Sequence, residues 1–309
     1  MCKCEKAYCQ YMSGPTEDAG TEALAIYLPV EGGYVQYMFV HSVIPAKQCN
    51  VWRLGPAFLC DGSFTRRFRL TRERAEWEMA LRLKDRPDFI GGVAHGDEVG
   101  DDVLCRIDGS ECSIHSLAVL TAFTQLELCV RSVGFDPAAP TEQVLRHYKR
   151  FVIHSKQIRV EQRVEWLTDV PLSKSYMAMM PPLKLVTDRY RIGEEEFVPI
   201  VCRSFSESGR FDTISLCGNM GLTFTMTVLQ YLSRNGENTC IITDNGGDQY
   251  HKMYFVLKHD GQASRGDIWE TVTQYSIIKA VYAHKIVDKK HRMTLAMRIS
   301  VCYNTVNRV

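Results

Sequence analysis

The sequence has almost no net charge and no long apolar run. Its 309 residues carry a formal net charge of +1, so electrostatics favour neither nucleic acid nor a membrane surface as a partner. No stretch approaches the roughly 18 apolar residues that a membrane span needs, and residues 1–20 lack the apolar core of a secretory signal. We therefore expect a soluble protein, either cytoplasmic or exported with its signal already removed.

The signatures of several enzyme classes are also missing. The sequence contains no G-x-S-x-G, no P-loop, no Rossmann glycine pattern after a strand and no H-E-x-x-H. These absences argue against α/β serine hydrolases, NTPases, dinucleotide-dependent enzymes and zinc proteases of that type. What remains is chemistry that an open β groove can host with histidine, tyrosine, arginine and carboxylate side chains.

Cysteine, in contrast, is abundant. Most of the 12 cysteines sit singly in strand-like runs such as VLCRI and ISLCGN, where a free thiol acts as a small apolar residue. The number of free cysteines favours a reducing compartment. A protein that degrades glycans would, in contrast, often lie outside the cell. Cys2, Cys4 and Cys9 form a cluster without the second half of a zinc site, and we expect residues 1–20 to be a flexible end.

The dominant hydrophobic period is two, which indicates strands with one buried face. QIRVEQRVEW (157–166) alternates apolar and charged residues, and EWEMALRLK (76–84) places Trp77 and Met79 on a buried face with Glu78 on a wet one. About a dozen or more such runs, divided by turn clusters, predict an all-β fold. We expect a two-sheet antiparallel β-sandwich or jelly roll formed by residues 21–309 as a single domain. Only residues 71–86 compete as a helix.

One glycine-rich stretch, DFIGGVAHGDEVGDD from residue 88 to 102, differs from the runs around it. Its glycines permit positive φ or a close approach of the backbone, and they bring His95, Asp97 and Glu98 together. His95 could act as a general base. If His115 came near, the four side chains could bind a divalent cation, although the sequence requires no cofactor. A hairpin turn with solvated acids is the alternative.

Two polar residues interrupt otherwise apolar faces. Gln162 occupies the inward register between Val160 and Val164, and Arg66 lies between two phenylalanines in SFTRRFRL. A buried amide must find hydrogen-bond partners or cost a few kcal/mol. Either neighbouring side chains satisfy these groups, or one sheet face is a polar groove.

Other segments supply candidates for the same groove. Tyr176 lies in a methionine-rich segment closed by two prolines, where its phenol could be held rigidly. The strand RHYKRFVIH contributes His147 and Lys149, and DNGGDQYHKMYF contributes Tyr250 and His251. Such aromatic and hydrogen-bonding groups stack on sugar rings, but a β-sandwich core uses the same residue types.

An almost all-strand chain of this size, with histidine, tyrosine, glutamine and arginine on a sheet face, resembles the jelly-roll polysaccharide lyases. The resemblance is one of architecture, and no diagnostic family motif aligns with it. It implies β-elimination at a uronic acid of an acidic polysaccharide. His95 or His147 would be the base and Tyr176 the acid, while Gln162, Arg66 or a metal would neutralise the carboxylate. The residues expected to bind substrate are Arg66, Glu98, Lys149, Tyr250 and His251.

Two other functions stay open. A glycoside hydrolase would pair Asp97 or Glu98 with a second carboxylate such as Glu161 or Glu165, because hydrolysis uses two carboxyl groups at a defined separation. A non-catalytic glycan-binding or structural β-sandwich, for example in a phage or virus particle, would tolerate substitution of the polar residues. Such a protein would assemble into symmetric oligomers.

Overall fold

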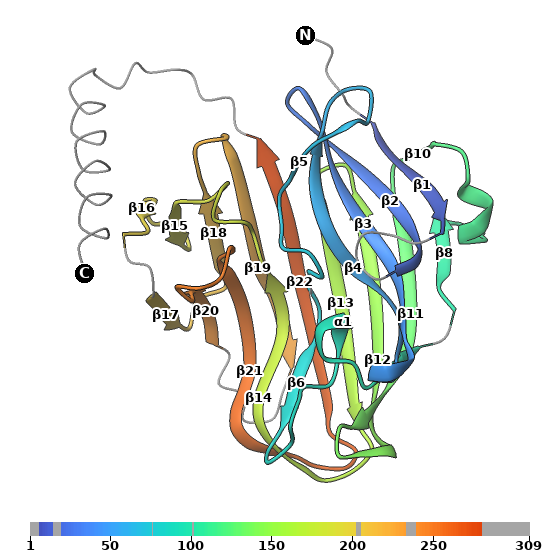
Figure 1. Cartoon of the computed structure of the whole chain (residues 1–309), viewed down its shortest axis with the longest axis vertical. Coiled ribbons are helices and arrows are strands. Elements are labelled where there is room, and N and C mark those ends of the chain that lie inside the picture. Colours follow the sequence, from blue (N-terminus) through green and yellow to red (C-terminus); the bar gives the residue numbers. More distant parts are fainter. Residues whose placement is uncertain are drawn as a thin grey trace, which may run out of the picture. The chain divides into compact units, whose positions relative to one another are not determined.

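The computed structural model describes residues 6–14, 20–75, 77–100, 102–201, 205–232 and 239–279, with only the backbone of residues 205, 258 and 259. Within this part the strands form two sheets, one of 17 strands and one of 5 (Figure 1). The predicted all-β sandwich is therefore confirmed. No helix in the described part of the chain is long and apolar enough to cross a membrane.

The first half of the larger sheet is an antiparallel meander. Its strands are β1 (Ala7–Ser13), β2 (Gly20–Val30), β3 (Gly33–Ile44), β4 (Cys49–Cys60), β5 (Arg66–Arg69), β7 (Glu98–Gly100) and β10 (Thr121–Phe123). The strands β1 to β4 pair in chain order, with β10 beside β1 and β5 beside β4. A short parallel pairing of β4 with β7 leads into the second half.

The second half of the larger sheet is antiparallel. It contains β8 (Leu104–Ile107), β9 (Ser110–Cys112), β11 (Leu126–Asp136), β12 (Ala139–His154), β13 (Gln157–Trp166), β15 (Arg189–Ile192), β16 (Val198–Pro199), β18 (Thr213–Cys217), β19 (Leu222–Leu232) and β22 (Ile268–Lys279). β7 and β8 both pair with β11. From β11 the order continues through β12, β13, β22, β19, β18 and β15 to β16.

The smaller sheet has the order β17, β20, β21, β14, β6. These strands are β6 (Ala80–Leu83), β14 (Val170–Met180), β17 (Phe205–Gly209), β20 (Thr239–Asp244) and β21 (Lys252–Ala263). The short helical turns of the described chain are η1 (Pro45–Lys47), α1 (Gly92–His95) and η2 (Ile114–Leu117).

Apolar side chains from both sheets meet in one core. Phe39 of β3 packs edge-on against Phe151 of β12, with ring centroids 5.1 Å apart. On the other side of the core, the Tyr275 hydroxyl of β22 donates a hydrogen bond to the Trp77 carbonyl, just before β6. The strands β12, β13 and β22 thus contact the meander through Phe151 and the segment just before β6 through Tyr275.

The alternation predicted for residues 157–166 is present in β13, where Val160 and Val164 are fully buried. The prediction for residues 76–84 was wrong at Glu78, which is buried rather than wet. Its carboxylate accepts a hydrogen bond from the Leu54 backbone N–H at 2.8 Å. Regular strand is confined there to β6, and the described residues between 71 and 86 form no helix.

The N-terminal stretch is more ordered than we expected. Residues 7–13 form β1, which pairs with both β2 and β10, so the expected flexible end is wrong for this segment. Cys9 is fully buried in β1, whereas Cys2 and Cys4 lie outside the described residues. The described residues up to Lys279 form one compact unit. A single domain from 21 to 309 stays a prediction.

Candidate functional site

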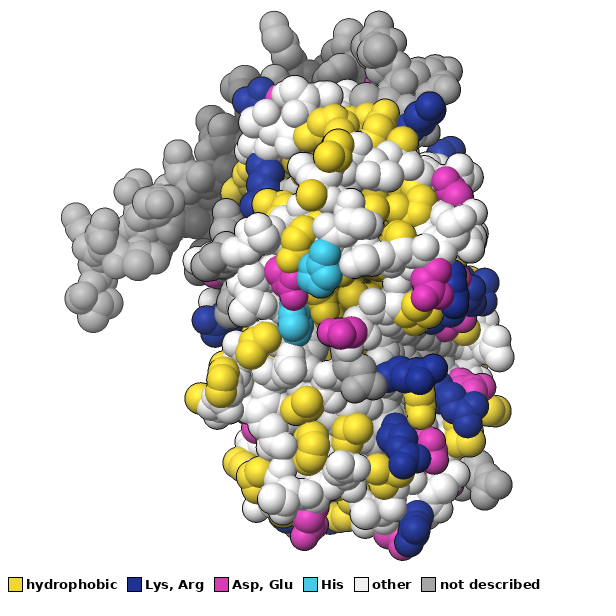
Figure 2. All heavy atoms as spheres, turned by 90° about the vertical axis from the view of Figure 1, so that its right-hand side faces the viewer, with side chains coloured by type: hydrophobic (Ala, Val, Ile, Leu, Met, Phe, Trp, Pro, Cys, Tyr) yellow, Lys and Arg dark blue, Asp and Glu magenta, His cyan; other side chains and the backbone are white. Residues whose placement is uncertain are grey.

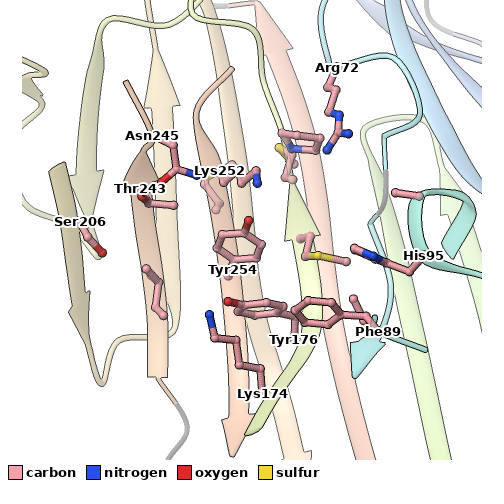
Figure 3. A pocket seen from close by; sticks show the side chains of 17 residues that line it. Arg72, Phe89, His95, Lys174, Tyr176, Ser206, Thr243, Asn245, Lys252 and Tyr254 are labelled. Atoms are coloured by element: carbon pink, nitrogen blue, oxygen red, sulfur yellow. Dashed lines mark hydrogen bonds between the residues drawn. The ribbon is translucent and has the colours of Figure 1, made fainter. Parts of the chain in front are cut away.

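A pocket of about 630 Å³ lies on the outer face of the smaller sheet (Figure 3). Its floor comes from paired positions on neighbouring strands: Ser206 is opposite Thr243, and Thr243 is opposite Lys252. One wall comes from Phe89 and from His95 of α1. The pocket therefore joins residues that are far apart in the sequence.

The strand period explains why these side chains face outward. In β21, Lys252 and Tyr254 are half-buried, while Met253 and Phe255 between and after them are buried in the core. In β14, Lys174 and Tyr176 share the outer face in the same way. Successive side chains of a strand point to opposite faces, so each strand contributes a cation and a phenol to the pocket.

Aromatic rings cross the floor of the pocket. Tyr176 stacks on Tyr254 with centroids 4.4 Å apart and an interplanar angle of 25°. Tyr176 also lies nearly parallel to Phe89, at 5.9 Å and 19°, and Phe89 in turn contacts His95 at 4.7 Å. The rings give the pocket an apolar surface.

His95 is held by a carboxylate and by a constrained turn. Its Nδ1 lies 2.7 Å from Asp88 Oδ1, and a proton on Nδ1 leaves Nε2 as the nitrogen that can accept another. Gly96 ends α1 with a φ of 97°, and a Cβ there would lie 2.2 Å from the Lys47 carbonyl oxygen. Only glycine fits this position, so the turn fixes the direction in which His95 points.

The charge of the pocket is one-sided. Arg72, Lys174 and Lys252 line it together with His95, and no aspartate or glutamate is among its described lining residues. Acidic side chains lie outside the lining: Lys252 Nζ is 3.8 Å from Asp248 Oδ2, and Asp88 bonds His95. The pocket therefore favours an anionic ligand.

Tyr250 extends the pocket beyond Arg72. The Arg72 guanidinium lies 5.0 Å from the centre of the Tyr250 ring, and Lys252 Nζ lies 5.2 Å from the same ring. A second hollow, lined by Tyr250 and Arg69, shares Arg72 with the first. Tyr250, His95 and Tyr176 are thus the predicted site residues that the structure brings close to one pocket.

Four other predicted residues meet in the core instead. Glu98 Oε1 is 3.1 Å from His147 Nδ1 and 3.3 Å from Lys149 Nζ. His147 Nε2 faces Gln162 Oε1 at 3.1 Å, and Gln162 donates to the Met177 carbonyl. Each of these four side chains is at most 3% exposed. Neighbouring groups thus satisfy the amide of Gln162, and its side chain is part of a buried network.

The environment of this buried network decides the ionisation of its carboxylates. Burial opposes the ionised form of Glu98, but Lys149 and hydrogen bonds from His147 and Ser132 outweigh it and hold the Glu98 pKa well below its usual range. Burial raises the pKa of Glu78, although Lys149 opposes this. Burial also lowers the pKa of His147 against the pull of Glu98.

The remaining predicted residues lie elsewhere. Arg66 donates to Gln36 and stacks 4.0 Å above Phe58, and His251 is buried beside Thr187 at 2.8 Å. His115 lies 3.5 Å from Glu22, which also bonds His41. Figure 2 shows one face of the molecule, on which histidine and acidic side chains adjoin.

The residues of the predicted metal site do not meet. Asp97 and Glu98 are in the turn near His95, but His115 bonds with Glu22 instead. Among the described residues, no group of three or more histidine, cysteine, aspartate or glutamate side chains has a geometry that could hold a metal ion. Binding of a divalent cation elsewhere in the protein stays a prediction.

A third hollow lies over the outer face of β12, β13 and β22. Two of the arginines that line it pair with glutamates: Arg150 is 3.1 Å from Glu161, and Arg163 is 3.3 Å from Glu270. Glu165, the other carboxylate considered for hydrolysis, pairs with Arg146. Acidic side chains of the same sheet thus partly compensate the positive charges of this third hollow.

Several pocket residues were not predicted from the sequence, namely Arg72, Phe89, Lys174, Lys252 and Tyr254. Nor was Asp88, which bonds His95 from outside the lining. For three of them a signal was present, because the alternation of KMYF and of SKSY places Lys252, Tyr254 and Lys174 on one face with Tyr176. Asp88 and Arg72 lie in irregular segments, where no period indicates direction.

No protein family model matches the sequence, and no curated protein matches it. Among solved structures, the chain is similar to the galactosidase domain of the α-galactosidase–sucrose kinase AgaSK, at 9% identity and a TM-score of 0.49 over 87% of this chain and 42% of that one. The Slr1438 protein from Synechocystis sp. PCC 6803 is 9% identical, with a TM-score of 0.41 over 86% of this chain and 99% of that one.

A heparan sulfate lyase, HepC from Pedobacter heparinus, is also similar, at 10% identity and a TM-score of 0.38. The match covers 88% of this chain and 37% of HepC. The predicted architectural resemblance to polysaccharide lyases is thus found among solved structures. With such identities and TM-scores, the likeness concerns architecture and not activity.

Proposed function

We propose that the pocket at His95 and Tyr176 binds an acidic polysaccharide and cleaves it at a uronic acid by β-elimination. The observation that carries this proposal is the lining itself: Arg72, Lys174 and Lys252 gather around stacked phenol rings, without an acidic residue among the described lining residues. Cations recognise carboxylates, and ring faces recognise the apolar faces of sugars. A uronate presents both a carboxylate and the apolar faces of a sugar ring, so its recognition uses both the cations and the aromatic rings.

The reaction requires three roles. A cation at the uronate carboxylate stabilises the negative charge that develops when the neighbouring proton leaves, and Arg72, Lys174 or Lys252 can supply it. His95 Nε2 takes the C5 proton, since Asp88 holds Nδ1. The electron pair forms the C4–C5 double bond, the C4–O bond breaks, and the Tyr176 hydroxyl gives its proton to the leaving oxygen.

Hydrolysis is less well supported. A glycosidase uses two carboxyl groups on either side of the scissile bond, and none of the described lining residues is acidic. Glu98, the candidate acid, is 2% exposed and bonded to Ser132 and Lys149. Binding without cleavage is consistent with the same lining, and the following assay separates it from elimination.

The test is the ultraviolet absorbance of the unsaturated uronate that elimination leaves, measured on a panel of uronic-acid polysaccharides with added divalent cation or chelator. We expect activity that falls by about 10² to 10⁴ in His95→Ala and Tyr176→Phe with little change in KM. His154→Ala is the matched control, because His154 is also half-buried but does not line the pocket.

Two outcomes would count against the proposal. Full activity in both pocket variants would show that His95 and Tyr176 are not the base and the acid. Binding of the polysaccharide without any unsaturated product would show that the protein binds the glycan but does not cleave it by elimination.

A further inference from the structure

Three interacting cysteine thiols belong to β1, β8 and β9 of the larger sheet. The strands β1 and β8 are on the right side of Figure 1. Cys105 of β8 and Cys112 of β9 have their sulfurs 3.7 Å apart. Cys9 of β1 interacts with these thiols: burial, and then the Cys112 thiol, raise the pKa of Cys9 to about 12, and Cys9 contributes to the raised pKa of Cys105. None of the three belongs to the proposed pocket.

The backbone already places Cys105 and Cys112 for a disulfide bond. They are direct partners in the antiparallel β8–β9 hairpin, and such partners have Cα atoms about 4.5 to 5.5 Å apart. A disulfide spans Cα distances of about 4.4 to 6.8 Å. The two sulfurs can therefore approach each other by side-chain rotation, without a change in strand register.

The two thiols differ in access. Cys105 is fully buried, while Cys112 is half-buried at the surface of the hairpin. An oxidant from solution reaches Cys112 first, and Cys105 is the neighbour in contact with it. The pair thus combines an accessible thiol with a neighbouring thiol that can resolve a mixed disulfide formed on it.

We propose that Cys105 and Cys112 are a redox pair that a small disulfide, such as oxidised glutathione, converts to an intramolecular disulfide. The Cys112 thiolate attacks oxidised glutathione, which gives a mixed disulfide on Cys112 and releases one glutathione. The Cys105 thiolate then attacks the Cys112 sulfur, forms the Cys105–Cys112 bond and releases the second glutathione. The two protons pass to the glutathione thiolates, and reduced glutathione reverses both steps.

The bond would close the open end of the β8–β9 hairpin, next to the strand β11 with which β8 pairs. Because the hairpin lies outside the pocket, we expect oxidation to leave glycan binding unchanged. The proposal is therefore independent of the proposed function.

The test is peptide mapping of the intact protein under non-reducing conditions after incubation with oxidised glutathione and trapping of free thiols. We expect a cross-linked peptide pair containing Cys105 and Cys112, two fewer free thiols, and recovery of both after addition of reduced glutathione. In Cys105→Ser, the reaction should stop at glutathione on Cys112.

Cys9→Ser and Cys217→Ser are matched controls, because each removes another buried thiol and should leave the cross-link intact. The proposal fails if wild-type Cys112 keeps its glutathione, if Cys112 does not react at all, or if the mapped bond joins Cys112 to Cys9.

Discussion

Two buried glutamates on either side of Lys149 have opposite ionisation properties. Lys149, His147 and Ser132 keep Glu98 ionised against the cost of burial, whereas burial dominates at Glu78 and raises its pKa. A buried charge stabilises a fold only when its partners compensate its desolvation. The two residues therefore contribute with opposite sign to stability at neutral pH.

We expect Glu98→Gln to lower the free energy of unfolding at neutral pH by about 3 to 5 kcal/mol, because it leaves Lys149 without its charged partner. Glu78→Gln should leave this free energy unchanged or raise it, because the amide oxygen can still accept the Leu54 N–H and the buried charge of Glu78 is removed. Urea unfolding of both variants beside the wild type measures the difference.

The pH dependence of the free energy of unfolding is the control for these two variants. Since the folded pKa of Glu98 is lowered, its contribution is present above the unfolded value of about 4.3 and is lost as pH falls toward the folded value. Acidification should thus cost the wild type more stability than Glu98→Gln. For Glu78 the raised pKa means that stability is lost as pH rises, and Glu78→Gln should reduce this loss. Equal pH profiles for all three proteins would contradict the assignment.

For single residues, the sequence indicated which side chains break the apolar pattern, but it did not indicate their hydrogen-bond partners. Gln162 was recognisable as a polar residue in an apolar register, and the structure gives its partners as His147 and the Met177 carbonyl. These partners come from other strands, so no local pattern could reveal whether Gln162 lines a groove or completes a buried network. Glu78 was assigned to the wet face for the same reason.

At the scale of elements, the α1 turn links the buried network to the pocket. Glu98 is anchored in the core three residues after His95, and Gly96 between them has the φ of 97° that side chains avoid. The turn therefore transmits the fixed position of Glu98 to the direction of His95. The glycines of this stretch, visible in the sequence, were a correct signal of a constrained turn.

We expect Gly96→Ala to lower the free energy of unfolding by about 1 to 3 kcal/mol, because it strains the backbone and brings a Cβ against the Lys47 carbonyl. It should also weaken elimination through the displaced His95. Gly62→Ala is the matched control, since a Cβ at Gly62 meets nothing within 4 Å. Thermal unfolding and the absorbance assay measure both effects, and a Gly96→Ala variant as stable as Gly62→Ala would refute this role of the turn.

At the scale of the whole molecule, the pocket depends on the pairing of distant strands. Tyr176, Lys252 and Thr243 meet because β20 pairs with β21, and β21 with β14. The period of two allowed the strands and the two-sheet sandwich to be predicted. Strand order follows from contacts between distant segments, and no pattern in the sequence specifies it, so the pocket could not be located beforehand.

The most direct test of the account is calorimetric titration of the protein with a size-defined uronic-acid oligosaccharide and with its carboxyl-reduced, neutral counterpart. We expect binding of the acidic ligand only, weakened about tenfold, or by about 1.4 kcal/mol, in Lys174→Gln. Lys156→Gln, which removes an equally exposed lysine outside the pocket, should bind like the wild type. Equal affinity for the acidic and neutral ligands, or an unchanged affinity in Lys174→Gln, would contradict the claim that this pocket recognises acidic glycans.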